Sequence, residues 1–187
     1  MSNPDAHTPE TSGATIWFTG LPSSGKSTLA AALAARLAAE GHRTQVIDGD
    51  VLRAALWPDL GFTRADRQAN VLRIEFIAQL LAQHGVKVIV ACIAPYLDVR
   101  AQVRKRHEDN GATYVEVHVS TPLSVCRQRD VKGLYARQAA GEIQNLTGVD
   151  GVYEPPTEPD VEIDTSSLDK SVCCDLLMAH LAKRGLC

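Results

Sequence analysis

The sequence predicts an α/β domain in which a parallel sheet of about five strands carries helices on both faces. Two observations support this fold class. From residue 14 onward, short apolar runs alternate with longer segments of helical character, and helical crossovers of this kind join parallel strands. Residues 86–92 are almost continuously apolar, which is typical of a strand buried on both faces of a parallel sheet. We expect residues 14–187 to form one domain without internal repeats.

The first elements follow from composition and stop signals. Residues 14–19 combine apolar, β-branched and aromatic side chains, so they predict a buried strand. After a glycine-rich turn, residues 28–40 are rich in Ala and Leu and predict a helix that ends at Gly41. Residues 44–48 predict the second strand, and a short helix is expected from about Val51.

The next helix begins at a capping box. In this pattern, the hydroxyl of Thr63 accepts from a first-turn amide while Asp66 reaches back to the start of the helix. The helix is expected to run to about His84, where Gly85 is the stop signal, and the strand at residues 86–92 follows.

The second half continues the alternation. A helix is expected at residues 97–107, a strand at 113–119 and a helix initiated by Pro122. Residues 161–164 predict the last short strand and residues 168–183 the closing helix. The alternation therefore covers the chain except for one long segment.

Composition excludes several classes of protein. With 45% hydrophobic and 22% charged residues and a net charge of −3, the chain fits a globular domain that does not bind nucleic acid or anionic membranes through bulk charge. No apolar run reaches the length of a membrane span. Residues 1–13 lack the features of a signal peptide, and we expect them to be a disordered leader. The five cysteines lack disulfide or metal spacing, so we expect a reduced, cytoplasmic chain.

Residues 20–27 carry the strongest motif. They read GLPSSGKS and match G-x-x-x-x-G-K-[ST] between a predicted strand and a predicted helix, where backbone amides and the helix N-terminus hold phosphates. A glycine-rich turn that matches by chance would lack this context. Lys26 would bridge the β- and γ-phosphates, and Ser27 would hold Mg²⁺. The expected ATP-binding residues here are Gly20, Leu21, Pro22, Ser23, Ser24, Gly25, Lys26, Ser27 and Thr28.

The phosphate-binding loop alone does not identify the reaction, because GTPases, ATP-driven machines and small-molecule kinases share it. The small size of the chain favours a kinase, and the guanine-reading pattern Asn-Lys-x-Asp is missing from the sequence. The strand at 86–92 ends in Ala91-Cys92 and offers no carboxylate for a metal, so Asp48 or Asp50 must assist.

Residues after the second strand suggest an acceptor site. Asp48, Asp50 and Arg53 lie where parallel sheets bind ligands, and a carboxylate there could orient Mg²⁺ or accept a proton from an attacking hydroxyl. The alternative is a turn capped by Asp48. Arg67 and Asn70 share a helix face and suggest an anionic, hydrogen-bonding ligand, although a solvated helix face would look similar.

Residues 130–160 are longer than most connections inside a domain, and such segments are often lids or binding loops. Alone, the basic residues at its start would be typical of a solvated surface. Beside a phosphate-binding loop they fit a lid that supplies positive charge to the transition state. These residues are Arg127, Arg129, Lys132 and Arg137.

The sequence resembles the adenylylsulfate kinases (APS kinases) along most of its length. The segments that carry the resemblance are GLPSSGKST (20–28), DGDVLR (48–53), DLGFTRADRQAN (59–70), IAPY (93–96), RDVKGLYARQAAGEIQNLTGVD (129–150) and YEPP (153–156). Members of this family use MgATP to phosphorylate the 3′-hydroxyl of adenosine 5′-phosphosulfate (APS). The resemblance implies a P-loop fold, this activity in sulfate activation, and ATP and APS as the small-molecule partners. Family members are often dimers, so a homodimer is a candidate assembly.

The resemblance also implies roles for individual residues. Lys26, Asp50 and Lys132 become the catalytic candidates, with Asp50 in the base-like role, and Ser27 and Asp48 the metal ligands. The remaining implied contacts are Arg129 with the adenine of ATP; Arg53, Arg67, Asn70 and the backbone of Ile93 with the phosphosulfate; and Phe62 and Leu146 with the acceptor adenine.

Two positions depart from the family pattern. Ala94 replaces a serine that serves as a phosphoenzyme residue in some members, so this chain cannot form that intermediate there. Direct in-line transfer needs only positioning and charge stabilisation. Leu146 replaces a phenylalanine that stacks on the acceptor adenine, and the loss of stacking would weaken acceptor binding by roughly 1 kcal/mol.

Two other hypotheses remain open from the sequence. One is a different small-molecule P-loop kinase, which would prefer an acceptor such as gluconate, shikimate or a nucleoside monophosphate. The other is a regulatory or scaffold protein that kept nucleotide binding and lost turnover, a reading motivated by Ala94 and Leu146.

Overall fold

Five parallel strands form the centre of the structure, a computed structural model that describes residues 13–187. Their order across the sheet is β2-β3-β1-β4-β5, so β1 is the central strand. The predicted parallel sheet is therefore confirmed, while the leader expected over residues 1–13 lies, apart from Gly13, outside the described residues. The strands are β1 (Ala14–Gly20), β2 (Thr44–Asp48), β3 (Lys87–Ala91), β4 (Thr113–Val119) and β5 (Val161–Ile163).

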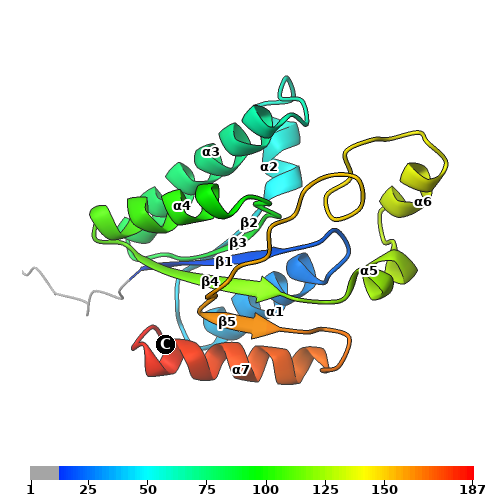
Figure 1. Ribbon diagram of the computed structural model, residues 1–187. Helices are drawn as coiled ribbons and strands as arrows, with labels where there is room; N and C mark the ends of the chain where they lie inside the picture. The colour runs from blue at the N-terminus through cyan, green and yellow to red at the C-terminus, as the bar shows by residue number, and fades with distance from the viewer. Residues whose placement is uncertain (1–12) are drawn as a thin grey trace, which may run out of the picture.

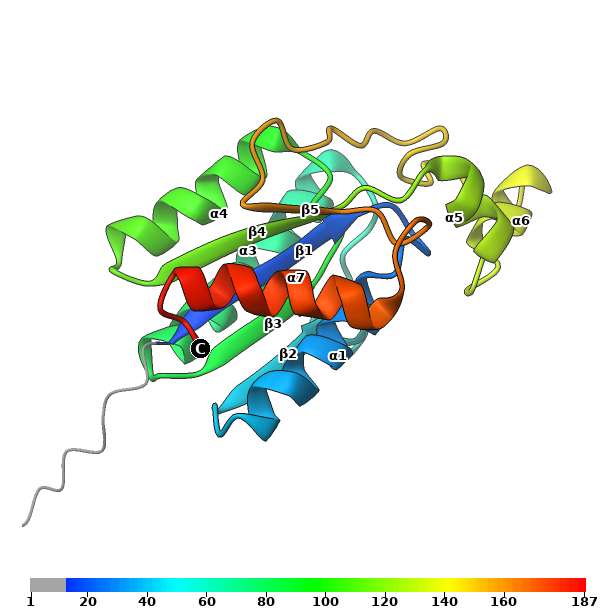
Figure 2. The same cartoon turned by 90° about the horizontal axis from the view of Figure 1, so that it is seen from below.

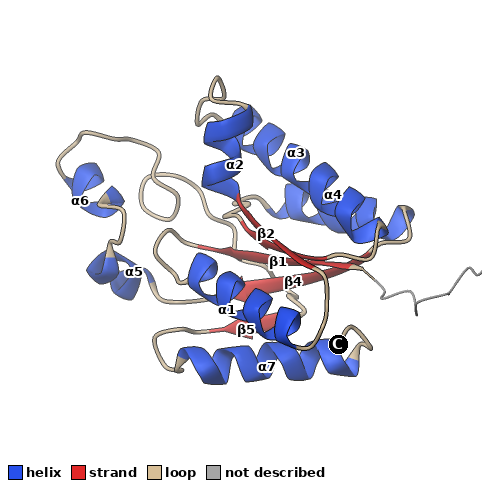
Figure 3. Ribbon diagram, turned by 180° about the vertical axis from the view of Figure 1, so that it is seen from behind, coloured by secondary structure: helices blue, strands red, loops and turns tan. Residues whose placement is uncertain are grey.

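Helices cover both faces of this sheet, as Figures 1 and 3 show. The helices α3 and α4 lie on one face and α1 and α7 on the other, while α5 and α6 lie beyond one end of the strands (Figure 1). Their bounds are α1 (Lys26–Ala39), α2 (Gly49–Leu56), α3 (Arg64–Gln83), α4 (Leu97–Asp109), α5 (Leu123–Arg129), α6 (Leu134–Ala139) and α7 (Lys170–Lys183). In the described part of the chain, none of these helices is long and apolar enough to span a membrane.

The core has two halves, because side chains of a strand alternate between the faces of the sheet. In β1, Ile16 and Phe18 join the apolar cluster that includes α1 and α7, whereas Trp17 joins the cluster on the α3 and α4 side. All seven residues of β1 are buried. This two-sided burial fixes β1 rigidly, and the phosphate-binding loop follows it directly.

Most predicted boundaries agree with the structure within two residues, and the differences have local causes. Helix α1 begins at Lys26 rather than residue 28, because Gly25 adopts a left-handed conformation (φ 105°) and serves as its N-cap. The capping box of Thr63 and Asp66 is confirmed at the start of α3. Pro122 occupies the N-cap position of α5 rather than its first turn. Helix α6, inside the segment 130–160, was not predicted.

The loops that follow the strands meet at one edge of the sheet. The phosphate-binding loop follows β1, the loop 92–96 follows β3, and α2 begins directly after β2. Seen from below in Figure 2, α5 and α6 project beyond this edge. Parallel α/β sheets bind their ligands at the carboxyl ends of the strands, so this edge is where a site is expected.

Candidate functional site

A cavity of about 820 Å³ opens at this edge of the sheet. It extends from the phosphate-binding loop to residues 130–160, named the lid segment after their predicted role, and to the start of α3. The structure therefore brings together most of the residues predicted from the sequence. The predicted site residues that line it are Pro22, Ser23, Ser24, Gly25, Lys26, Ser27, Thr28, Asp48, Asp50, Phe62, Arg67, Ile93, Arg129, Lys132 and Leu146.

The phosphate-binding loop holds its lysine in place. The ammonium of Lys26 donates to the carbonyls of Gly20 at 2.9 Å and Leu21 at 2.7 Å. Gly20 and Leu21 do not line the cavity themselves, so within the described structure they act through Lys26. Burial lowers the pKa of Lys26 to about 8 because the charged ammonium has lost much of its hydration. A bound polyanion would restore the stability of the charged form.

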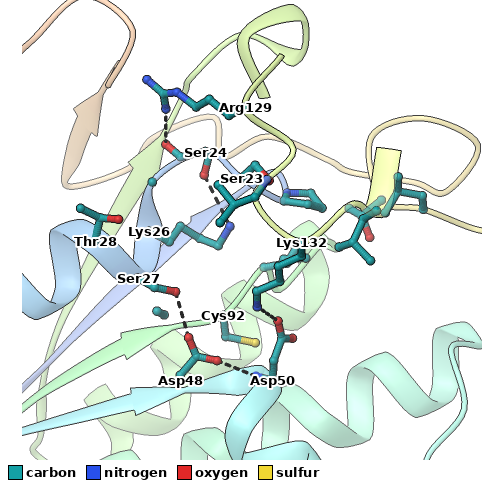
Figure 4. A pocket seen from close by; sticks show the side chains of 18 of the residues that line it. Ser23, Ser24, Lys26, Ser27, Thr28, Asp48, Asp50, Cys92, Arg129 and Lys132 are labelled. Carbon is teal, nitrogen blue, oxygen red and sulfur yellow. Dashed lines mark hydrogen bonds and ion pairs between the residues drawn. The ribbon is translucent and has the colours of Figure 1, made fainter. Parts of the chain in front are cut away.

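Asp48 connects the end of β2 to the phosphate-binding loop (Figure 4). Its Oδ1 accepts from the amides of Asp50 at 3.0 Å and Val51 at 3.3 Å, which caps α2. Its Oδ2 accepts a hydrogen bond from the hydroxyl of Ser27 at 2.9 Å. The helix-cap interpretation and the metal-site interpretation of Asp48 are thus compatible, since each uses a different oxygen.

Cys92 directly follows β3, at a position from which a carboxylate could reach a metal ion at the phosphate-binding loop. The thiol lines the cavity, and burial raises its pKa to about 12, so it is neutral at physiological pH. A neutral thiol is a poor ligand for Mg²⁺, which prefers oxygen. The carboxylate that contacts Ser27 is instead that of Asp48, at the end of β2, one of the two acids that the sequence offered.

An ion pair joins the lid segment to α2. The Nζ of Lys132 lies 2.6 Å from Oδ2 of Asp50, and the contact raises the pKa of Lys132 (Figure 4). Both side chains remain largely exposed to the cavity, so water screens the attraction. The pair places a cation and a carboxylate side by side on the cavity wall.

On the acceptor side, Arg67 links α3 to the lid segment. Its guanidinium donates to Oγ1 of Thr147 and to the carbonyl of Asn145, both at 2.7 Å, and to the carbonyl of Phe62 at 3.1 Å. The ring of Phe62 is 66% exposed and lines the cavity. An exposed aromatic ring beside a guanidinium can hold the flat base of a nucleotide.

Arg53 and Asn70 do not line the cavity, in contrast to the other predicted acceptor residues. The guanidinium of Arg53 donates to the carbonyls of Leu60 and Gly61 and lies 4.5 Å above the ring of Phe62. Asn70, which is 8% exposed, accepts from Nε1 of Trp57 at 2.6 Å. Both residues thus shape the loop 57–62 that carries Phe62, and their contact with a ligand stays a prediction.

Leu146 belongs to a small apolar cluster between the lid segment, α5 and the phosphate-binding loop. It is buried with Cys126 and Tyr135, and Leu21 packs against them. The lid segment also contacts the phosphate-binding loop through hydrogen bonds, from the hydroxyl of Tyr135 to the carbonyl of Pro22 at 2.9 Å and from the amide of Val131 to Oγ of Ser23 at 3.2 Å. Leu146 therefore combines a packing role in the lid with a position on the cavity wall.

Thr165, which follows β5, is not among the residues that the sequence predicts for the site. Its hydroxyl lies 2.8 Å from the carbonyl of Ser24 and from the hydroxyl of Thr121, and Arg129 donates to it at 2.7 Å. Thr165 thus fixes Arg129 against the phosphate-binding loop. No local pattern marks it, because its partners are distant in sequence. Leu168, Lys170 and Cys173 line the same end of the cavity and were also missed.

A phosphate-binding loop at the centre of a five-stranded parallel sheet shares one cavity with carboxylates and a basic segment, and this arrangement defines a P-loop kinase. Family comparison narrows this class. A sequence model described as "Adenylylsulphate kinase" matches residues 12–164. The chain belongs to the adenylylsulphate kinase family.

Individual relatives agree with this assignment. An adenylyl-sulfate kinase of Microcystis aeruginosa is 49% identical over 162 residues, which cover 86% of this chain and 87% of the relative. One from a Synechococcus strain is 47% identical over 173 residues, which cover 92% of this chain and 96% of the relative. The solved structure of the Mycobacterium tuberculosis APS kinase CysC in complex with AMPPNP and APS superposes with a TM-score of 0.88 at 42% identity, covering 91% of this chain and 98% of that one.

Proposed function

We propose that this chain transfers the γ-phosphate of MgATP to the 3′-hydroxyl of APS, giving 3′-phosphoadenosine 5′-phosphosulfate and ADP in sulfate activation. One observation carries the proposal: a single cavity is lined by the phosphate-binding loop, by the pair Asp50 and Lys132, and by Phe62 and Arg67. Two anionic nucleotides could meet there head to head. We take residues 14–187 as one kinase domain with residues 130–160 as its lid.

The donor nucleotide binds at the phosphate-binding loop. Amides of residues 22–28 and the N-terminus of α1 bind its phosphates, and Lys26, held by Gly20 and Leu21, neutralises the β- and γ-phosphates. Arg129, held by Thr165, borders the adenine. The ATP-binding site is thus formed by residues at the ends of β1, β5 and α5.

Oxygens at the start of α1 and the end of β2 fit the requirements of Mg²⁺. The hydroxyl of Ser27 and the carboxylate of Asp48 already lie 2.9 Å apart, and Mg²⁺ commonly takes one or two protein oxygens together with phosphates and water. Among residues 13–187, no group of three or more His, Cys, Asp or Glu side chains could hold a metal by itself. The bound ion would neutralise charge on the phosphates during transfer.

The transfer step uses Asp50 and Lys132. Asp50 accepts the proton of the 3′-hydroxyl while the hydroxyl oxygen attacks the γ-phosphate, and Lys132 stabilises the charge of the transferred phosphoryl group. Closure of the lid excludes water from this reaction. Ala94 has no hydroxyl, so the phosphoryl group passes directly to the acceptor. Arg67 and the backbone of Ile93 bind the phosphosulfate, with Arg53 and Asn70 supporting, while Phe62 and Leu146 contact its adenine.

An acceptor-specificity assay tests the proposal. Purified protein with MgATP should form the 3′-phosphorylated product from APS, and turnover with gluconate, shikimate or a nucleoside monophosphate should be at background. Preference for one of those acceptors would instead identify another small-molecule kinase. ATP binding without turnover of any acceptor would support the regulatory or scaffold reading that Ala94 and Leu146 motivate.

Replacing Leu146 by phenylalanine should tighten acceptor binding. The residue lines the cavity, and an aromatic ring there could stack on the acceptor adenine, which corresponds to about a fivefold lower acceptor KM for roughly 1 kcal/mol. The KM for ATP should not change. Steady-state kinetics with each substrate varied in turn measures both constants. An unchanged acceptor KM would show that the departure at this position does not affect the acceptor site.

We further propose that the enzyme acts in the cytoplasm on these two small molecules, without a nucleic acid or membrane partner, and that it assembles as a homodimer. Light scattering coupled to size exclusion measures the assembly directly, and a mass of a single chain at working concentration would contradict the dimer.

A further inference from the structure

The loop after β3 is held by three separate parts of the chain. This loop, residues 93–96, lies beside Asp48 and Asp50 because β3 is the neighbour of β2 in the sheet. Three successive carbonyls of the loop each accept one hydrogen bond. The donors are Oγ1 of Thr19 to Ile93 at 2.5 Å, Nη1 of Arg100 to Ala94 at 2.6 Å, and the amide of Glu154 to Pro95 at 2.8 Å.

The backbone at Ala94 needs this support. Ala94 has a φ of 44°, in the left-handed region that a residue with a Cβ atom adopts only at a cost, and it is 1% exposed. The turn directs the chain from Ile93, which lines the cavity, into the buried Pro95 and Tyr96. Such a conformation persists when the surrounding contacts determine it.

Arg100 provides contacts to two segments at once. It is 3% exposed, lies in the second turn of α4, and does not line the cavity. Besides the carbonyl of Ala94, its guanidinium donates to the carbonyl of Glu154 at 2.5 Å, and its Nε forms an ion pair with Glu116 at 3.0 Å. The planar fork of arginine can serve these partners together, which the single ammonium of lysine cannot.

The carboxylate of Glu154 strengthens the same junction. Its Oε2 accepts the amide of Leu97 at 2.7 Å, at the first residue of α4. Next to it, the hydroxyl of Tyr153 lies 3.1 Å from the hydroxyl of Thr19. The end of the lid segment therefore contacts the loop 93–96 through Glu154 and β1 through Tyr153, and the buried guanidinium of Arg100 bonds to both the loop and Glu154.

We infer that Arg100 is a positioning residue for the acceptor substrate: it fixes the turn at Ala94 and thereby the backbone of Ile93 that faces the acceptor end of the cavity. This inference rests on the proposed function, because it takes the acceptor to bind against Ile93. Arg100 does not touch the donor loop, so its effect should fall on the acceptor and not on ATP.

Two Arg100 variants test the inference by steady-state kinetics and thermal melting. Arg100→Lys keeps a positive charge beside Glu116, and the double variant Arg100→Gln with Glu116→Gln removes both charges so that no buried carboxylate is left unpaired. In each, the acceptor KM should rise about tenfold or more, as expected when a charged hydrogen bond that orders a binding loop is lost. The KM for ATP should stay within about twofold.

Glu116→Gln alone is the matched control. It removes the ion pairs of Glu116 with Arg100 and Arg104 but leaves both carbonyl contacts of Arg100, so its acceptor KM should equal that of the unmodified enzyme even if its melting temperature changes. An acceptor KM that rises equally in the control, or stays unchanged in both Arg100 variants, would overturn the inference. The unmodified enzyme measured in parallel separates this outcome from failure of the proposed function, which would show as no turnover of APS.

Discussion

Replacing Lys26 by alanine should lower turnover by about 10²- to 10³-fold, the loss typical of removing one preorganised donor to a transition-state oxygen. The ammonium of Lys26 donates to the carbonyls of Gly20 and Leu21. When ATP is bound, oxygens of the transferred phosphoryl group would replace these carbonyls as its partners. Single-turnover measurements with saturating MgATP and APS would isolate the transfer step. A loss below about fivefold would contradict the role assigned to this residue.

The pKa of Lys26 adds a pH dependence to this prediction. Burial lowers the pKa to about 8, so the free enzyme loses the ammonium charge as the pH rises above that value. Because kcat/KM reports the free enzyme, kcat/KM for ATP should fall above about pH 8, approaching tenfold per pH unit. The matched control is the residual activity of Lys26→Ala, which should lack this alkaline limb. A limb that persists in the variant would assign it to another group.

The same shift has a stability consequence with a defined sign. The ordinary pKa of a lysine is 10.5, so between about pH 8 and 10.5 the unfolded chain binds more protons than the folded one. Lys26 therefore makes the free energy of unfolding increase with pH across this window. Below this window, the buried ammonium lowers the free energy of unfolding of the free enzyme, and a bound phosphate would offset that cost.

Replacing Asp50 by asparagine should lower kcat by about 10²- to 10⁴-fold, the range for loss of a general base. Asparagine has the same shape and cannot accept the proton of the acceptor hydroxyl. The KM for ATP should change little, since Asp50 faces the acceptor side of the cavity. Steady-state assays with each substrate varied measure these constants, and Asp175→Asn, a surface carboxylate paired with Arg36, serves as the control.

Asp50 could also act only by holding Lys132, and a double-mutant cycle separates the two roles. If Asp50 accepts the proton and Lys132 stabilises the phosphoryl group, Lys132→Met should lower kcat further in the background of Asp50→Asn. If the carboxylate only orients the lysine at 2.6 Å, the double variant should lose no more than the single variants. The second outcome would contradict the base-like role.

The sequence predicted the parts of the fold that local chemistry determines. The strand at 44–48 and the capping box of α3 depend on neighbouring residues, and both are confirmed. Helix α6 could not be predicted, because its first amides are capped by the side chain of Asp130 across the left-handed residue Gly133. That arrangement follows no short-range spacing rule.

In the candidate site, too, features that depend on neighbouring residues could be predicted and those that depend on tertiary contacts could not. The motif of the phosphate-binding loop predicted residues that the structure places along the cavity, because such a loop depends on consecutive backbone amides. The positions of Arg53 and Asn70 behind the loop 57–62 could not be foreseen, since a side chain on a helix face points toward ligand or protein depending on tertiary packing. Thr165 and Arg100 act through partners that are distant in the sequence, and only the folded chain brings them together.

The lid segment is not a detachable module. Three successive residues of the phosphate-binding loop contact it: Leu21 in the apolar cluster, Pro22 through Tyr135 and Ser23 through Val131. At Gly148, an added Cβ would lie 2.3 Å from Cδ2 of Leu21, so the lid fits this particular side chain closely. Exchanging lid segments between relatives would therefore require exchanging residues 21–23 as well. In a chimera that keeps the original residues 21–23, the foreign lid segment would not fit against the phosphate-binding loop.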